Sequence, residues 1–248
     1  MLPFRRQKAP HELGEDVPTV ISELKARKHW KSLPPAVFQR FTDNANYVFD
    51  DSRATAVALR WLTFTLELKS FRGRLQEIAS AECWSDELST LSSNLHSFAL
   101  AYEKAVISAR NDRDYVGALL IVVRALTSSL VCNRYSLWSY TTLARISLTF
   151  RENREDAALW CARYRKAESD LLTVDESTLD DYTRAVRELL YPYKVRQTAK
   201  EMQRVLPKHS RLPKHLLDKY LPDLDSGPLT AREDVEQIEA MLGIQPVM

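Results

Sequence analysis

The stretch LSTLSSNLHSFALAYEKAVISA, residues Leu88–Ala109, decides the fold class of this chain. Its apolar residues recur at alternating spacings of three and four, and the set is Leu88, Leu91, Leu95, Phe98, Tyr102, Ala105 and Ala109. This spacing places them on one face of an α-helix, and the two-residue alternation of a β-strand cannot produce it. A helix with one narrow apolar seam is typical of antiparallel bundles and α-solenoids.

Breaker residues extend the helical interpretation to about residues 36–191. No proline lies between Pro35 and Pro192, and only Gly73 and Gly117 interrupt that stretch. The whole chain has 5 glycines in 248 residues, well below the usual share of about 7%. This scarcity argues against hairpin-rich β folds, Rossmann units and phosphate-binding loops. We predict an all-α fold, an antiparallel bundle or short α-solenoid of roughly 9–11 helices.

Capping residues mark where several helices begin. Asp51 or Ser52 would cap one helix over 53–79, and Asn111 or Asp112 the apolar helix that runs to Val131. A helix is expected over 136–150, followed by one that Asn153 caps and that runs to about Leu172. Ser177 with Asp180 predicts a further helix, which ends before Pro192.

The C-terminal part differs from this core in composition. Helices are expected over 194–206 and 214–220, and the composition of residues 222–229 indicates a linker. Thr230 to Glu233 form a capping box for a last helix, whose apolar face is Val235, Ile238, Met241 and Leu242 and which Gly243 ends. We expect it to pack on its own domain; the alternative is loose docking or a partner. The predicted segments are a basic arm (1–16), a helical core (17–191), a basic proline-punctuated segment with linker (192–229) and the capped helix (230–248).

Two segments resemble helix pairs of tetratricopeptide repeats. In the first, Tyr102, Ala105, Val106 and Ala109 precede a turn, and Ala118, Val122 and Ala125 follow it. In the second, Leu143, Ala144 and Leu148 precede a turn, and Ala157, Cys161, Tyr164 and Ala167 follow it. The repeat period, the first-helix glycine and the closing proline of that family are not reproduced, and an ordinary bundle with alanines at its helix crossings explains the same residues. The resemblance implies a protein- or peptide-binding scaffold and assigns no catalytic residue.

Motifs of enzyme sites are missing from the sequence. The histidines (His11, His29, His96, His209 and His215) form no zinc-binding spacing, and no nucleophile elbow, phosphate loop, dinucleotide fingerprint or EF-hand loop occurs. Acidic pairs such as Asp50–Asp51 lie at expected helix starts, where they complement the helix dipole. We therefore expect no enzyme activity, no catalytic residue, no cofactor and no metal, although a site assembled from distant residues would not be visible in the sequence.

Charge and cysteine content favour an intracellular protein. The net charge is +2, and the three cysteines, Cys83, Cys132 and Cys161, are far apart without a CxxC pair, which indicates a reducing, cytoplasmic location. Residues 1–16 do not resemble a signal peptide. The stretch Tyr115–Cys132 approaches the length of a membrane span, but Arg124 and the polar triplet 127–129 interrupt it, so a buried core helix is expected instead.

A basic segment over 194–219 provides the candidate binding surface. Its cations are Lys194, Arg196, Lys200, Arg204, Lys208, Arg211, Lys214 and Lys219. Arg196, Lys200 and Arg204 recur every four residues and share one helix face. Such a face could hold phosphates, bind an acidic protein groove, or act only as a solvated surface.

Two functions remain open at this point. The first is a non-enzymatic helical scaffold, adaptor or subunit of an assembly, whose partner is another protein or a second copy. The alternative is a helical nucleic-acid-binding protein, nucleocapsid- or matrix-like, that uses the 194–219 face. A second basic stretch, Lys25–Lys31 around Trp30, and the arm at Arg5–Lys8 would add to that surface. We rank the scaffold first, because its features span the chain.

Overall fold

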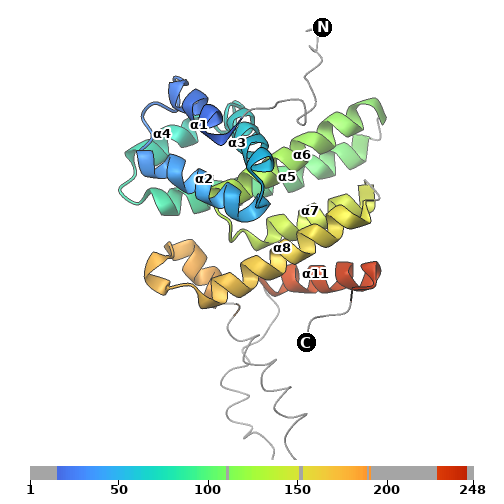
Figure 1. The fold of residues 1–248 in the computed structure, drawn as a ribbon. Coiled ribbons are helices and arrows are strands. Elements are labelled where there is room, and N and C mark those ends of the chain that lie inside the picture. The colour runs from blue at the N-terminus through green and yellow to red at the C-terminus, as the bar shows by residue number, and fades with distance from the viewer. Residues whose placement is uncertain (1–15, 110–111, 151–152, 189, 191–227, 245–248) are drawn as a thin grey trace, which may run out of the picture. The chain divides into compact units, whose positions relative to one another are not determined.

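The computed structural model describes residues 16–109, 112–150, 153–188, 190 and 228–244. All regular elements in these ranges are helices, which confirms the predicted all-α fold (Figure 1). They are α1 (Val17–Ala26), α2 (Pro35–Phe49), α3 (Ser52–Leu66), α4 (Arg72–Ser80), α5 (Trp84–Ala109), α6 (Asp112–Cys132), α7 (Leu137–Phe150), α8 (Arg154–Thr173), the 3₁₀ turn η2 (Glu176–Thr178) and α11 (Pro228–Leu242). Residues 181–188 and 190 are also helical. The helices divide into two compact units, Met1–Ser139 and Tyr140–Met248.

In the first unit, α3 and α6 lie at the centre of the packing. Figure 1 shows α3 between α1 and α6, and α5 lies alongside α6. The predicted seam of α5 is buried where its side chains are described, with Leu88, Leu91 and Leu95 at most 1% exposed. These side chains belong to one apolar core with Trp30, Phe41 and the inner leucines of α3, Leu59, Leu62 and Leu66.

The helix expected over 53–79 is two helices in the structure. Helix α3 ends at Leu66, Glu67 is its C-cap residue, and α4 begins at Arg72. The intervening turn is held by the Leu68 amide, which donates to the Thr65 carbonyl, and by the Arg72 side chain, which donates to the Glu67 carbonyl. The break lets Phe71 enter the core, where it lies edge-on against Phe98 of α5. A continuous helix would have kept α4 in line with α3.

Two other expected helix starts are also wrong. Residues Glu176–Thr178 form a 3₁₀ turn, and the following helix begins after Asp180, whose carboxylate accepts hydrogen bonds from the Thr183 amide and hydroxyl. Helix α11 begins at Pro228, so Thr230 lies within it, and the last two residues of the expected linker, 228 and 229, are helical. Proline at the first helical position needs no amide donor and therefore starts a helix well. The predicted end is confirmed, because Gly243 adopts a left-handed φ of 75°.

The second unit contains α7, α8, η2, the helix that follows it and α11. Tyr140 of α7 lies against Trp160 of α8, and Asn153 caps α8 as predicted, accepting from the Asp156 amide at 2.9 Å. Helix α11 packs on α8 through Ala231, Val235 and Ile238, which are buried. The expectation that this helix packs on its own domain is therefore met, but Met241 is 67% exposed and does not belong to the buried face.

Helix α6 contains a long apolar stretch. Residues Tyr115–Cys132 have a mean hydropathy of 1.9 and are long enough to cross a membrane by length and composition alone. Half of this stretch is buried inside the helical packing. Core helices of globular proteins commonly have this property, since a helix that is apolar all round is covered on several sides by its neighbours.

Candidate functional site

Helix α3 carries a second apolar stripe on the side that faces away from the core. The stripe recurs at spacings of three and four, and consists of Ala54, Val57, Trp61, Phe64 and, two residues past the helix end, Leu68; we call it the α3 face. Phe64 is 41% exposed and Leu68 is 39% exposed. Large apolar side chains aligned in this way on a surface indicate an interaction site rather than scattered exposure.

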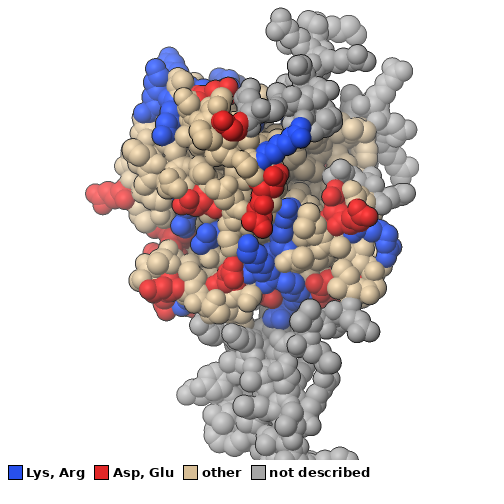
Figure 2. Space-filling view, in the orientation of Figure 1, with Lys and Arg blue, Asp and Glu red and all other residues tan. Residues whose placement is uncertain are grey.

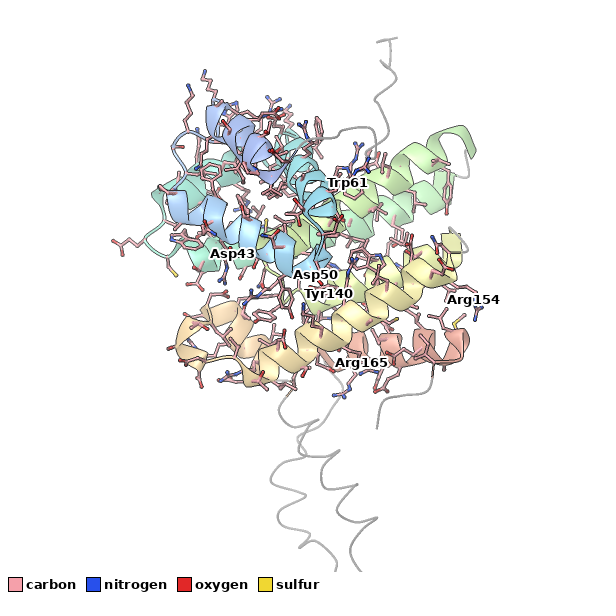
Figure 3. All side chains as sticks on the ribbon, in the orientation of Figure 1. Asp43, Asp50, Trp61, Tyr140, Arg154 and Arg165 are labelled. Carbon is pink, nitrogen blue, oxygen red and sulfur yellow. The ribbon has the colours of Figure 1, made fainter. Side chains whose placement is uncertain are left out.

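A pocket of about 380 Å³ lies at the N-terminal half of the α3 face. Its lining is mostly apolar and comes from the end of α2, from α3 and from α6: Phe49, Asp51, Arg53, Ala54, Val57, Ala58, Trp61 and Thr127. Figure 3 labels Trp61 on the side of α3 that is turned toward α6. The hydroxyl of Thr127 is buried and has no hydrogen-bond partner within the described part of the chain. An apolar pocket with one unsatisfied polar group is a typical binding feature.

The C-terminal half of the α3 face meets a cation of α6. The guanidinium of Arg124 lies over the Phe64 ring, 5.9 Å from its centroid. Its Nε is buried without a hydrogen-bond partner, and no carboxylate of the described residues pairs with it. Burial lowers the pKa of Arg124 from its usual value, because desolvation disfavours the charged form. Within the described part of the chain, this partly desolvated guanidinium therefore lacks the anion that such a group normally contacts.

Helix α6 packs beside the α3 face. Trp61 meets Thr127 in the pocket and Phe64 meets Arg124, so the two helices run antiparallel. Toward the N-terminus of α6, the same helix face carries Leu120, which is partly exposed, and Val116, which is 71% exposed. These side chains precede Arg124 at intervals of four residues, so α6 carries an apolar stripe on the face that bears Arg124.

The opposite border of the α3 face is formed by α1. Glu23 pairs with Arg60, with a shortest distance of 3.2 Å, and Arg27 pairs with Glu67. The later residue of α1 pairs with the later residue on the α3 side, so α1 and α3 run parallel. The charged side chains on the α1 side of the α3 face are thus paired with one another. On the α6 side, the charge that contacts this face is Arg124.

A second cluster is polar and lies inside the first unit. The hydroxyls of Ser129, Ser136 and Ser139 lie 3.0–3.1 Å from one another, and Ser92 and Ser129 each donate to the other's carbonyl at 2.8 Å. His96 Nδ1 lies 3.2 Å from Ser139 Oγ. A histidine beside a serine can act as base and nucleophile, but Ser139 is 0% exposed, so a substrate has no access to it. The cluster satisfies buried polar groups between α5, α6 and the start of α7.

An ionic cluster joins α8 and α11 in the second unit. Arg165 binds Glu239 through two hydrogen bonds, of 3.1 and 2.7 Å, and Figure 3 labels Arg165 on α8. Glu168, which is nearly buried, accepts a hydrogen bond from the Tyr164 hydroxyl and lies 3.6 Å from both Arg165 and Arg232. Burial and the neighbouring Glu168 raise the pKa of Tyr164. Since every charge in this cluster has a partner, we assign it a structural role.

The candidate surface expected over 194–214 falls outside the described residues, with all of its cations: Lys194, Arg196, Lys200, Arg204, Lys208, Arg211 and Lys214. The structure therefore does not test it. The second basic stretch is described: Arg27 pairs with Glu67, Lys25 lies over Phe38 and Trp30 is fully buried, whereas Lys28 and Lys31 are exposed. Over the face drawn in Figure 2, acidic and basic side chains of the described residues are interspersed.

Candidate metal ligands and reactive thiols are not brought together. No group of three or more histidine, cysteine or acidic side chains lies close enough to hold a metal ion in the ranges that the structure covers. Cys83 is exposed, while Cys132 and Cys161 are buried. Burial raises the pKa of Cys161 to about 11, so this thiol stays protonated at neutral pH.

The α3 face was not among the predicted site residues, although a signal was present. Helix α3 carries one stripe of Leu59, Leu62 and Leu66 and a second of Val57, Trp61 and Phe64. A helix that is apolar on two sides can bury both only if each side packs against other residues. The core of the first unit buries one side of α3. Comparison of the chain with protein-family models, with curated proteins and with solved structures gives no match.

Proposed function

We propose that this chain is a non-enzymatic helical scaffold that binds a partner protein through the α3 face. The observation that carries the proposal is the apolar stripe from Ala54 to Leu68, beside a second apolar stripe on α6, with Phe64 and Val116 clearly exposed. The resemblance of the α5–α6 and α7–α8 pairs to tetratricopeptide-like helix pairs supports the same class of function.

The partner surface that fits best is an amphipathic helix. Anchors at spacings of three and four would pack along Val57, Trp61 and Phe64 in the manner of helix-in-groove recognition. A carboxylate on that helix would pair with Arg124, which has a desolvated guanidinium and no described anionic partner. Tryptophan and arginine side chains carry much of the binding energy in such interfaces.

Photo-crosslinking tests this proposal. A photoreactive phenylalanine at position 64 is compared with one at Leu159, an exposed apolar residue of α8, in lysate of the native host. We expect position 64 to capture a defined protein that position 159 does not, and that protein, once purified, to bind the unmodified chain. Trp61→Ala should weaken its binding about tenfold or more, Arg124→Gln should weaken it less, and Leu159→Ala should leave it unchanged.

The same experiment separates the two functions that the sequence left open. Equal capture at positions 64 and 159, or binding that Trp61→Ala does not weaken, rejects the α3 face as the interface. If the captured ligand is RNA, and if Arg196, Lys200 and Arg204 changed to Glu abolish binding while Trp61→Ala does not, the nucleic-acid alternative replaces the scaffold. Binding to RNA would also weaken steeply with added salt, because phosphate contacts release counterions.

A further inference from the structure

We propose that the pocket of the α3 face is occupied by the chain's own N-terminal arm, residues 1–15, with Phe4 as its anchor. Occupation of the pocket goes beyond the proposed function and does not depend on it, whereas competition with a partner rests on that function. The inference rests on where the described chain begins, on the chemistry of the pocket and on the composition of the arm.

The described chain begins on a helix, α1, that packs against α3, the helix that carries most of the pocket lining. Asp16 caps α1 by accepting from the Thr19 amide at 2.8 Å. Because α1 runs parallel to α3 with Glu23 opposite Arg60, the start of α1, about 9 Å before Glu23, lies level with the first turns of α3. Those turns carry Ala54 and Val57 of the pocket.

The arm is long enough to enter the pocket and return. Neighbouring helices lie about 8–10 Å apart, so the distance from α1 across to the α3 face is short. The segment between Phe4 and Asp16 can span about 40 Å when extended, at about 3.3 Å per residue. The segment is therefore long enough for Phe4 to reach the pocket. Closing so short a loop also costs little conformational entropy.

The pocket and the arm match in chemistry. The walls that Phe49, Val57 and Trp61 provide suit an aromatic ring, and the arm carries Leu2 and Phe4 within its first four residues. Arg5 and Arg6 follow directly, and Asp50 and Asp51 lie at the α2–α3 junction beside Phe49. Arg53 also lines the pocket, so the two aspartates leave this end with a net charge of −1 that the paired arginines of the arm complement.

Docking of the arm would cover Trp61 until a partner displaces it. A partner helix that uses the whole α3 face needs the space that Phe4 fills, so the two compete for the same side chain. The arm then competes with the partner within the same molecule. The apparent affinity for the partner is the intrinsic affinity multiplied by the fraction of molecules in which the pocket is open.

Thiol labelling in the full chain tests the proposal. Cys83→Ser removes the exposed thiol, and Ala54→Cys places a reporter in the pocket, while Cys132 and Cys161 stay buried. We expect the reporter to be alkylated slowly in this background, and Phe4→Ala to accelerate it about tenfold, the effect of losing one buried aromatic anchor. Arg5→Glu with Arg6→Glu should also accelerate labelling, and Asp50→Asn should do so to a smaller extent.

Controls separate docking from other causes. A reporter placed instead at Leu159→Cys should be labelled at one rate with and without Phe4→Ala. Protection of position 54 that is independent of protein concentration supports docking within one chain, whereas protection that grows with concentration shows docking between copies and overturns the proposal. Labelling of position 54 that neither Phe4→Ala nor the Arg5 and Arg6 reversals accelerate overturns it as well. Neither result bears on capture of a partner at position 64, so this inference and the proposed function fail separately.

Discussion

Asn44 closes the end of α6 from inside the core. It is 1% exposed, and its amide nitrogen donates to the carbonyls of Val131 and Cys132 at 2.9 and 3.0 Å. The last carbonyls of a helix have no partner within the helix, and these two lie in an apolar core. One side chain from α2 therefore supplies hydrogen bonds that water supplies at an exposed helix end.

Replacing this side chain should destabilise the first unit. Asn44→Ala leaves two buried carbonyls unsatisfied, and we expect a loss of about 2–3 kcal/mol in the free energy of unfolding. Urea denaturation followed by circular dichroism measures it. Asn46→Ala, two residues along on the exposed side of α2, should change stability by less than about 0.5 kcal/mol. Equal effects of both variants would show that the Asn44 hydrogen bonds add nothing.

Residue-level contacts such as these are not visible in the sequence. There, Asn44 is one polar residue among several in a helical stretch, and its partners lie 87 and 88 positions away. The serines at 92, 129, 136 and 139 likewise interrupt apolar stretches of the sequence, whereas they bond to one another in the core. Periodicity identifies which face is apolar, but it does not pair a buried polar group with its acceptor.

Among the elements, α11 depends on a few charged contacts. Its buried apolar side chains, Ala231, Val235 and Ile238, are small or medium in size, so burial alone holds it weakly. The bidentate pair between Arg165 and Glu239 adds two charge-assisted hydrogen bonds, which are stronger than neutral ones. Arg154 donates to the Met241 carbonyl near the helix end.

Removing the charge of Glu239 should loosen α11. We expect Glu239→Gln to cost about 2 kcal/mol and to speed amide hydrogen exchange in residues 231–242 about thirtyfold. Glu236→Gln is the matched control, because Glu236 is 43% exposed and pairs with Arg232 at 3.4 Å, and exposed pairs contribute little. If both variants exchange at the same rate, the buried pair does not hold the helix.

The elements themselves follow from the sequence to different degrees. Helix α8 and its cap at Asn153 are predictable, since an asparagine before a periodic stretch satisfies the first amides. The separation of α3 from α4 is not, because the residues from Glu67 to Phe71 contain no proline or glycine. We attribute the end of α3 to the burial of Phe71 in the core. This is a tertiary contact, which the helix propensities of the individual residues do not predict.

On the scale of the whole molecule, each unit buries one thiol. Cys132 belongs to the first unit and Cys161 to the second. Burial raises the pKa of Cys132 strongly and that of Cys161 to about 11, against an ordinary value of 9.0. Between pH 9 and 11, unfolded chains therefore lose these protons while folded chains retain them. Because only the unfolded state loses protons in this range, raising the pH favours unfolding. The contribution of the two thiols to the free energy of unfolding is therefore fully present below about pH 9 and decreases above it.

Alkaline denaturation checks this sign. We expect the urea midpoint of the chain to fall between pH 8 and pH 10.5, and the fall to be smaller when Cys132 and Cys161 are both replaced by alanine. Cys83→Ala should change the pH dependence less than the double replacement, since that thiol is exposed and a hydrogen bond with Asp86, not burial, is the main cause that raises its pKa. A slope that is identical in all three proteins would mean that the buried thiols are not the source.

The order of the helices along the chain matters during synthesis. The face of α8 that holds α11, with Cys161, Tyr164 and Glu168, leaves the ribosome long before Pro228 and the residues that cover it. At about 5–20 residues per second, that face waits for several seconds with its apolar groups uncovered. A nascent-chain chaperone that binds short apolar helix faces would bind this face of α8. A pause in translation before residue 228 would prolong its exposure.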